Sequence, residues 1–341
     1  MIFVTGATGL VGSHLVLSLL QKGLPVRALK RKTSNLDRVR KVFQWYSTEA
    51  GELFDRIEWV DGDLMDYFSL EDALRDVDMI YHCAAEVSFN RRKWKRIMQN
   101  NVEGTANLVN AALYNGVKRI CHVSSIAALG NKKDGQVVTE ASQWAPDGKQ
   151  SVYAESKFRS EAEIWRGGEE GMDAVVVHPS VIIGPGSWTS GSGQFFDRIY
   201  KGLAFYTPGV TGYVDVRDVT DAMILLTEEQ NFAQACNRKF LLNAENLEFR
   251  EFMGMIAGSL KVPAPKYKAG YFLMHLARVF LGFISLISGR EAYLNKDMIA
   301  SALRRSYFDG SRISNLFGFR YRTITGAVQY TAECYLKDRK S

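Results

Sequence analysis

The first 180 residues alternate between short apolar runs and longer segments with an apolar position every three or four residues. Short, nearly continuous apolar runs are typical of strands that are buried on both faces. The strand candidates are Ile2–Thr5, Val26–Leu29, Ile57–Val60, Met79–Cys83, Arg119–Val123 and Ala174–His178. The helix candidates between them include Leu10–Lys22, Lys93–Asn115 and Tyr153–Gly167. Alternation of strand and helix predicts parallel βαβ units, and therefore an α/β fold around a doubly wound parallel sheet.

The pattern loosens after Pro179, where Gly-, Ser- and Pro-rich stretches separate the predicted helices. These helices are Val216–Glu228, Phe249–Leu260 and Gly270–Ser288. We expect a large sheet domain over residues 1–180, to which the chain returns near residues 213–243. Most of residues 181–341 would then form a smaller, interleaved C-terminal domain on the substrate side.

Composition and cysteine spacing limit the class of protein. Hydrophobic residues make up 46% of the 341 residues and charged residues 23%, as in an ordinary globular chain. The four cysteines are far apart and form no CxxC pair, which argues against a zinc site or a disulfide framework and favours a reducing compartment. Residues 1–23 have no basic region before their apolar run, so they resemble a strand and a helix more than a signal peptide. We therefore expect a cytoplasmic protein without a metal site.

Positive charge is concentrated near the C-terminus. The net charge is +6, but residues 261–341 hold 14 Lys and Arg against 5 Asp and Glu, and the rest of the chain is slightly acidic. A basic region can contact nucleic acid, anionic lipid or an acidic substrate. The cations here are scattered and no nucleic-acid motif accompanies them, so we expect no nucleic-acid partner.

One segment of this basic region, residues 269–289, is mostly apolar and carries Arg278 as its only formal charge. A narrow polar stripe along it consists of His275, Arg278, Gly282, Ser285 and Gly289. A helix of this kind must bury most of its circumference against protein, substrate or lipid, and an interior arginine argues against a membrane span. Two interpretations stay open: a core helix that caps the substrate, or a helix that lies on an anionic membrane surface.

A glycine-rich turn joins the first predicted strand to the first predicted helix. It reads Gly6-Ala7-Thr8-Gly9-Leu10-Val11-Gly12. In such a turn the first glycine permits a tight bend, the second lets a pyrophosphate approach the backbone, and the third lets the helix pack on the strand. The free N–H groups at the helix N-terminus then bind the anion. The turn predicts a dinucleotide site on a Rossmann-type fold, with cofactor contacts from Gly6, Thr8, Gly9, Leu10, Val11 and Gly12.

The end of the second predicted strand bears on the choice between the two nicotinamide cofactors. An acidic residue there would bind the 2′-hydroxyl of NAD, but the chain reads Lys30-Arg31-Lys32-Thr33-Ser34 and has no carboxylate before Asp37. A guanidinium is shaped to hold a 2′-phosphate through two hydrogen bonds. A solvated basic turn is the alternative. We predict NADP(H) rather than NAD(H), with Arg31 as the principal contact.

Tyr153 and Lys157 are candidates for acid–base chemistry. They lie four residues apart, and therefore on one face of a predicted helix. A nearby cation, together with the charge of an oxidised nicotinamide, favours the phenolate and would lower the tyrosine pKa from its usual value near 10. A pair on a helix surface is the alternative. Two serines, Ser124 and Ser125, end the fifth predicted strand roughly thirty residues earlier.

The GxxGxxG turn, the YxxxK spacing and the serine pair together resemble the extended short-chain dehydrogenase/reductase family. The resemblance covers nearly the whole chain, because residues 213–219 (YVDVRDV) also match a late family signature. Members of the family usually use the serine five residues before a glycine, which selects Ser125 before Gly130 and leaves Ser124 as a backbone-capping hydroxyl. The resemblance therefore implies Ser125, Tyr153 and Lys157 as the catalytic residues.

The resemblance also implies further contacts to the cofactor. Asp63 and Leu64 would lie at the adenine edge, and small residues after the fourth strand would let the backbone approach the cofactor. The full set of these additional residues is Asp63, Leu64, Ala84, Ala85, Asn101, Val123 and Pro179. The role of Asn101 would be partly architectural. His178 stands where relatives often carry arginine, and we interpret it as a packed side chain.

Two later stretches, residues 182–186 (IIGPG) and 207–219 (TPGVTGYVDVRDV), resemble the dihydroflavonol-reductase and 3β-hydroxysteroid-dehydrogenase branch. This branch implies NADPH-dependent reduction of a ketone or aldehyde on a hydrophobic small molecule, with Tyr153 as general acid. One alternative is a nucleotide-sugar epimerase or dehydratase with tightly held NAD, which the missing acid after the second strand disfavours. The other is a non-catalytic protein on the same fold, which the retained Tyr153 and Lys157 disfavour.

The family resemblance further implies a homodimer. In relatives, two long helices pair across a two-fold axis. The corresponding predicted helices in this chain are Lys93–Asn115 and Tyr153–Gly167. The expected partners are therefore a hydrophobic small molecule and a second copy of the chain, with a membrane contact through residues 269–289 as the open alternative.

Overall fold

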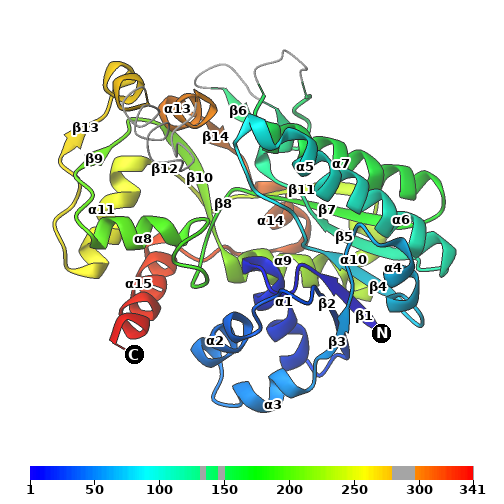
Figure 1. The fold of residues 1–341 in the computed structure, drawn as a ribbon. Coiled ribbons are helices and arrows are strands. Elements are labelled where there is room, and N and C mark those ends of the chain that lie inside the picture. The colour runs from blue at the N-terminus through cyan, green and yellow to red at the C-terminus, as the bar shows by residue number, and fades with distance from the viewer. Residues whose placement is uncertain (131–135, 145–149, 279–295, 341) are drawn as a thin grey trace.

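A seven-stranded sheet lies at the centre of the computed structural model, which describes residues 1–130, 136–144, 150–278 and 296–340 (Figure 1). All neighbouring strands in this sheet are parallel, in the order β11-β7-β5-β4-β1-β2-β3. The order runs outward in both directions from β1 and β4, as in a doubly wound Rossmann sheet. The strands are β1 (Ile2–Thr5), β2 (Val26–Lys30), β3 (Glu58–Asp61), β4 (Met79–His82), β5 (Arg119–Val123), β7 (Asp173–Pro179) and β11 (Arg238–Leu242).

The six strands predicted from apolar runs are confirmed, and each boundary lies within one residue of the prediction. The pattern does not predict β11, because Arg238 and Lys239 open it and only its last three residues are buried. This strand lies at the edge of the sheet and pairs only with β7. An edge strand tolerates charged residues, and so its sequence lacks the continuous apolar run of the central strands.

Helices cover both faces of the sheet. Phe3 and Ile80 face one helical layer, whereas their neighbours Val4 and Tyr81 face the other, because successive side chains of a strand point to opposite sides. The layer drawn above the sheet in Figure 1 contains α4 (Tyr67–Ala73), α6 (Gly104–Tyr114) and α7 (Val152–Glu169). The opposite layer contains α1 (Leu10–Gln21), α2 (Asp37–Tyr46), α3 (Ala50–Asp55), α9 (Val216–Thr227), α10 (Glu229–Ala235) and α14 (Ser311–Phe317).

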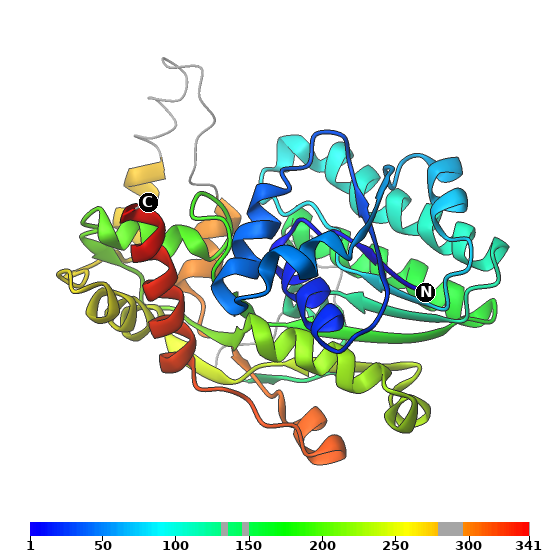
Figure 2. The same ribbon diagram turned by 90° about the horizontal axis from the view of Figure 1, so that it is seen from below.

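A second group of elements has a core of its own beside the sheet. Tyr213 of β10 stacks on Phe252 of α11 with 4.3 Å between ring centroids, and Tyr335 of α15 is buried in the same cluster. Figure 2 shows α15, in red, along this unit. The three-stranded sheet and its helices are β8 (Val181–Ile183), β10 (Val210–Asp215), β12 (Glu245–Glu248), α8 (Gly193–Tyr200), α11 (Phe249–Leu260) and α15 (Ile324–Lys340).

Two pairs of short strands lie outside the two larger sheets. Two parallel strand pairs join residues distant in the sequence, namely β13 with β9 and β14 with β6. Their bounds are β6 (Val137–Val138), β9 (Phe205–Tyr206), β13 (Tyr267–Lys268) and β14 (Tyr307–Phe308). The 3-10 helix η3 (Ile126–Leu129) follows β5, and α13 (Lys296–Leu303) precedes β14.

The predicted continuous helix Lys93–Asn115 is wrong in one respect, because the structure divides it. A 3-10 turn η1 (Arg91–Lys93), the helix α5 (Trp94–Met98) and a π-helical turn η2 (Gln99–Glu103) precede α6. The π-turn contains Asn101, whose side chain bonds Glu86 and Ser156. A π-turn inserts an extra residue into the helical repeat, and such turns are frequent at functional sites. Apolar periodicity does not report this local change.

The apolar segment 269–289 lies only partly within the described residues. Residues 271–278 are helical, in agreement with the prediction, and residues 279–289 lie outside the described ranges. Within those ranges, no helix combines the length and apolarity needed to cross a bilayer.

Candidate active site

The glycine-rich turn between β1 and α1 is packed so tightly that side chains would not fit. Gly6 has a φ of +67°, and a Cβ there would lie 2.6 Å from the Ala84 nitrogen. A Cβ at Gly12 would lie 2.2 Å from the Gly6 carbonyl oxygen. The Gly9 amide donates to that same oxygen at 2.8 Å. These contacts explain two glycines of the motif. Gly6 needs a positive φ, and Gly12 allows the helix to approach the strand closely.

A cavity of about 150 Å³ lies directly on this turn. Thr8, Gly9 and Leu10 line one side, and residues 184–193 line the other. No side chain caps α1 at Gly9, so the N–H groups of its first turn are available to an anion. The residues present therefore fit the pyrophosphate of a dinucleotide, with the backbone of the turn as its cradle.

Two arginines lie near the expected position of a 2′-phosphate. Arg31 follows β2 and is exposed, while Lys30 is committed to an ion pair with Asp61. Arg38, in the first turns of α2, lines the cavity beside the glycine turn. Sequence reasoning missed Arg38, although its position in a helix that directly follows the basic turn was an available signal.

The other expected cofactor contacts differ in their surroundings. Ala84 lies against Gly6, and its neighbour Ala85 is exposed. Asp63 accepts a bond from the Met65 amide at 3.0 Å, which stabilises its own turn. Leu64 packs with the core under α6, so its side chain is structural. Pro179 ends β7 and is buried.

Lys157 lies in the interior, with 1% of its surface exposed. Its ammonium donates to the Val123 carbonyl at 2.7 Å and contacts the Nε2 atom of His122 at 3.3 Å. Burial lowers the pKa of Lys157 to about 8, and the nearby Glu161 carboxylate opposes this shift. The carbonyl that ends β5 thus fixes the lysine beside the C-terminal edge of the sheet, which is where Rossmann folds bind ligands.

Tyr153 lies one turn earlier on α7, and its hydroxyl is hydrogen-bonded with Ser125. Burial raises the pKa of Tyr153, and the bond with Ser125 opposes the rise. In the protein alone, desolvation of the phenolate outweighs the stabilising contacts, and the lowering expected beside an oxidised nicotinamide stays a prediction. The phenol stays protonated at neutral pH, as a proton donor requires.

The adjacent Ser124 has a different environment. Its hydroxyl donates to Glu161 at 2.9 Å, and its amide donates to the Val177 carbonyl at 2.8 Å. Alternation along the chain after β5 therefore turns Ser124 into the core and Ser125 toward Tyr153. The structure brings together Ser125, Tyr153 and Lys157 and excludes Ser124 from that group.

Glu161 is the centre of a buried polar cluster that sequence reasoning missed. One carboxylate oxygen accepts from Ser124 and from His178 Nε2 at 2.7 Å, and the other accepts from Lys239 at 2.7 Å and from Trp165 at 3.1 Å. Burial alone would raise the pKa of Glu161, but His178 and Lys239 together hold it well below the usual range. Glu161 falls on the same helical face as Tyr153 and Lys157, at four-residue steps, and this spacing was the available signal.

A second polar chain connects β1 with the π-turn. Thr105 donates its only hydroxyl hydrogen to the Asn101 carbonyl at 2.6 Å, so it must accept from His82 Nε2 at 2.9 Å. His82 Nδ1 then accepts from the Thr5 hydroxyl at 2.7 Å. Burial lowers the pKa of His82 to about 3, in agreement with this neutral form. Asn101 continues the chain to Ser156, next to Lys157, at 2.9 Å.

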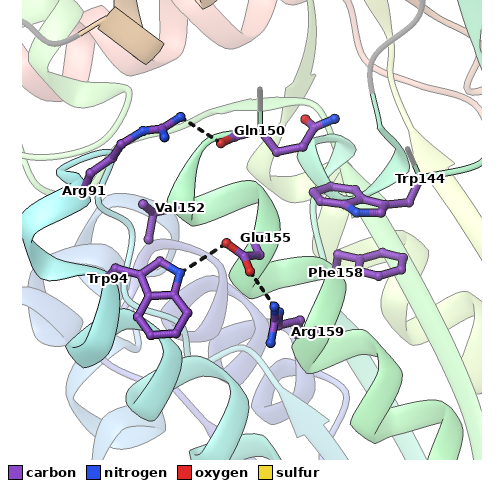
Figure 3. Close-up of a pocket in the computed structure, with 8 residues that line it drawn as sticks. All are labelled: Arg91, Trp94, Trp144, Gln150, Val152, Glu155, Phe158 and Arg159. Carbon is purple, nitrogen blue, oxygen red and sulfur yellow. Dashed lines mark hydrogen bonds and ion pairs between the residues drawn. The ribbon is translucent and has the colours of Figure 1, made fainter. Parts of the chain in front are cut away.

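A larger groove of about 780 Å³ lies on the opposite face of α7 (Figure 3). Trp94 donates to Glu155 at 3.2 Å, and Trp144 stacks on Phe158 with 4.6 Å between centroids. Arg91 bridges to the Gln150 carbonyl at 3.3 Å. Neither Tyr153 nor Lys157 lines this groove, so its size does not mark the chemical centre. It lies between α5 and α7, the helices for which we expect contact with a second copy.

Comparisons with known proteins extend over nearly the whole chain. The model of the NAD dependent epimerase/dehydratase family matches residues 2–237. The chain is 29% identical over 331 residues to a putative dihydroflavonol 4-reductase of Synechocystis sp., covering 96% of this chain and 92% of that protein. It is 32% identical over 236 residues to cinnamoyl-CoA reductase 1 of Petunia hybrida, covering 66% and 68%. The crystal structure of gox2253 matches with a TM-score of 0.80 and 27% identity, covering 99% and 98%.

The Glu161 cluster generates a stability prediction. Glu161→Gln removes the charge that compensates His178 and Lys239, and we expect the free energy of unfolding at pH 7 to fall by about 3–5 kcal/mol. The control is Glu163→Gln on the same helix, whose carboxylate forms a more exposed pair with Arg166. That control should lose no more than about 1 kcal/mol. Urea denaturation measures both, and equal losses would contradict the role of Glu161.

The same variant has a predictable pH dependence. The folded-state pKa of Glu161 is below its unfolded value, so its stabilising contribution is complete above the ordinary carboxyl pKa of about 4.3 and is lost as the pH falls below it. The gap in stability between wild type and Glu161→Gln should therefore narrow on acidification from about pH 5. A gap that stays constant would show that the charge of Glu161 is unimportant.

Proposed function

Since this chain belongs to the NAD-dependent epimerase/dehydratase family, as an NAD(P)-dependent oxidoreductase of the extended short-chain dehydrogenase/reductase type, we propose that it reduces a ketone or aldehyde on a hydrophobic molecule with NADPH. The observation that carries this proposal is the group formed by Ser125, Tyr153 and Lys157 at the C-terminal edge of the sheet. Within it, a protonated phenol and a cation lie one helical turn apart.

The proposed chemistry follows from the states of these side chains. Ser125 donates a hydrogen bond to the substrate carbonyl oxygen and polarises it. Tyr153 holds a proton at its hydroxyl because burial raises its pKa, and it delivers that proton to the same oxygen. Lys157 is held by the Val123 carbonyl, in reach of a ribose and of the tyrosine region. The nicotinamide cofactor, when bound, supplies the hydride.

The proposed substrate class rests on the relatives and on the late motifs. By their names, the relatives are a putative reductase of a dihydroflavonol and a reductase of cinnamoyl-CoA. We propose a carbonyl compound of similar apolar character for this chain.

The proposal of NADPH over NADH rests on charge near the glycine turn. Arg31 and Arg38 are both exposed cations on the side of the turn where β2 ends and α2 begins. The carboxylate Asp61, at the end of the neighbouring strand β3, is neutralised by Lys30. A doubly charged 2′-phosphate is favoured in such surroundings, whereas a 2′-hydroxyl gains little from them.

The catalytic proposal is tested by a pair of serine variants and a tyrosine variant. We expect Tyr153→Phe to lower kcat for NADPH oxidation by about 10²- to 10⁴-fold, because it removes the proton donor and keeps the ring. Ser125→Ala should lower kcat strongly, whereas Ser124→Ala should chiefly lower the thermal stability. Activity over a panel of aromatic, steroidal and aliphatic carbonyl compounds measures these effects. Activity in Tyr153→Phe equal to that of an active wild type would refute the role of Tyr153, whereas wild-type activity no higher than background would favour a non-catalytic protein.

The cofactor proposal is tested by removing the two arginines. We expect Arg31→Ala and Arg38→Ala each to weaken NADPH binding by roughly 10- to 100-fold, the loss of a hydrogen bond between charged groups. NADH binding should change little, because NADH has no 2′-phosphate. Arg56→Ala is the control, since Arg56 is also an exposed arginine but ends α3. Isothermal titration gives the dissociation constants, and an equal loss for NADH and NADPH would contradict the assignment.

A further inference from the structure

Several large apolar side chains are exposed near the second group of elements, and we call the five most exposed of them the aromatic face. The exposed fractions are 47% for Phe205, 62% for Tyr267, 70% for Tyr271, 80% for Phe272 and 56% for Leu276. Large apolar side chains exposed singly are common on proteins, but a contiguous group marks an interaction surface.

These residues lie on one strand pair and on the helix that directly follows it. Phe205 of β9 and Tyr267 of β13 are partners in a parallel strand pair, and their ring centroids lie 5.7 Å apart. The Ala269 amide donates to the Tyr206 carbonyl at 2.7 Å and fixes the start of the next segment. The helix of residues 271–278 follows at once and carries the other three residues (upper left of Figure 1).

The stretch of chain that carries most of this face has charged side chains of one sign only. The sequence has no Asp or Glu from Phe252 to Arg290. In the described part of that stretch, Lys266 and Lys268 are exposed on either side of Tyr267, and Lys261 is exposed just before them. Arg250, which precedes this stretch and is followed by Glu251, lies over the Tyr206 ring at 5.3 Å. Aromatic rings and cations thus alternate at one end of the molecule.

We propose that the aromatic face lies on the surface of an anionic phospholipid bilayer. Aromatic side chains accumulate at the boundary between lipid headgroups and acyl chains, and flanking cations are attracted to anionic headgroups. Stable membrane binding usually needs both signals, and this face has both. A second copy of the chain fits less well, because a two-fold contact through this face would bring Lys266 and Lys268 against the same cations. The proposal does not rest on the proposed reductase activity.

Vesicle binding by the full-length chain tests the proposal. We expect co-sedimentation with vesicles of 7:3 phosphatidylcholine and phosphatidylglycerol at low salt, and much weaker binding to phosphatidylcholine alone. Phe272→Ser should reduce the partition coefficient by about tenfold or more, because it removes a ring that enters the membrane. The matched control is Phe68→Ser, since Phe68 of α4 is 75% exposed but lies elsewhere. That control should bind like wild type.

A charge-reversal pair tests the electrostatic part. Lys266→Glu with Lys268→Glu should reduce the partition coefficient by at least about 25-fold, on the basis of roughly fivefold for each cation. The control pair, Arg56→Glu with Lys118→Glu, changes the net charge equally at exposed positions on other elements. If both pairs lower the partition coefficient equally, the effect comes from net charge alone, and the proposal is overturned.

Two further outcomes would overturn it. One is the absence of binding to the anionic vesicles at low salt by wild-type protein that has a cooperative thermal transition. The other is a change of oligomeric state in Phe272→Ser, seen by sedimentation velocity without lipid, which would make the face a contact between copies. The carbonyl-reductase assay is independent of each of these readouts, so failure of one proposal is distinguishable from failure of the other.

Discussion

The buried carboxylate of Glu161 is the interaction on which the arrangement of the site depends. A charge that is 2% exposed is costly unless every oxygen is paired, and here two donors reach each oxygen. These donors come from the end of β5, from α7 itself, from β7 and from β11. These bonds therefore fix the position of α7 along the strands β5, β7 and β11. It also holds Ser124 inward, so that the next residue, Ser125, faces the opposite way.

A second network under the same helical layer, between β1, β4 and α6, uses neutral hydrogen bonds for the same purpose. His82 stays uncharged because it is fully buried, and its two nitrogens join Thr5, next to the glycine turn, to Thr105 on α6. Asn101 then links this chain to α7 through Ser156. The glycine turn and the Tyr153–Lys157 helix are thus positioned through one connected set of bonds. Asn101 lies in the π-turn η2, and its side chain reaches Ser156 from there.

Lys157 and Tyr153, which have proposed chemical roles, lie beside these two networks, and their pKa values shift in opposite directions. Burial lowers the pKa of Lys157 to about 8 and raises that of Tyr153. Both shifts have one cause, because the same desolvation penalises whichever form of a group is charged. A protonated phenol beside a hydroxyl donor suits protonation of an oxygen, which is the half-reaction that a carbonyl reductase needs from its protein. The exposed Arg31 and Arg38 lie outside this dry centre.

The sequence by itself determined the features that neighbouring residues encode. Apolar runs predicted six strands of the sheet, the glycine spacing predicted a turn that excludes side chains, and four-residue spacing put Tyr153 and Lys157 on one helical face. Ser125 was selected over Ser124 by resemblance alone. The tertiary structure decided what depends on partners distant in the chain: the Glu161 cluster with His178 and Lys239, the placement of Arg38 on the cavity, and the edge strand β11. The physical reason is that periodicity and turn chemistry act over a few residues, whereas burial and charge pairing depend on which strands become neighbours in the sheet.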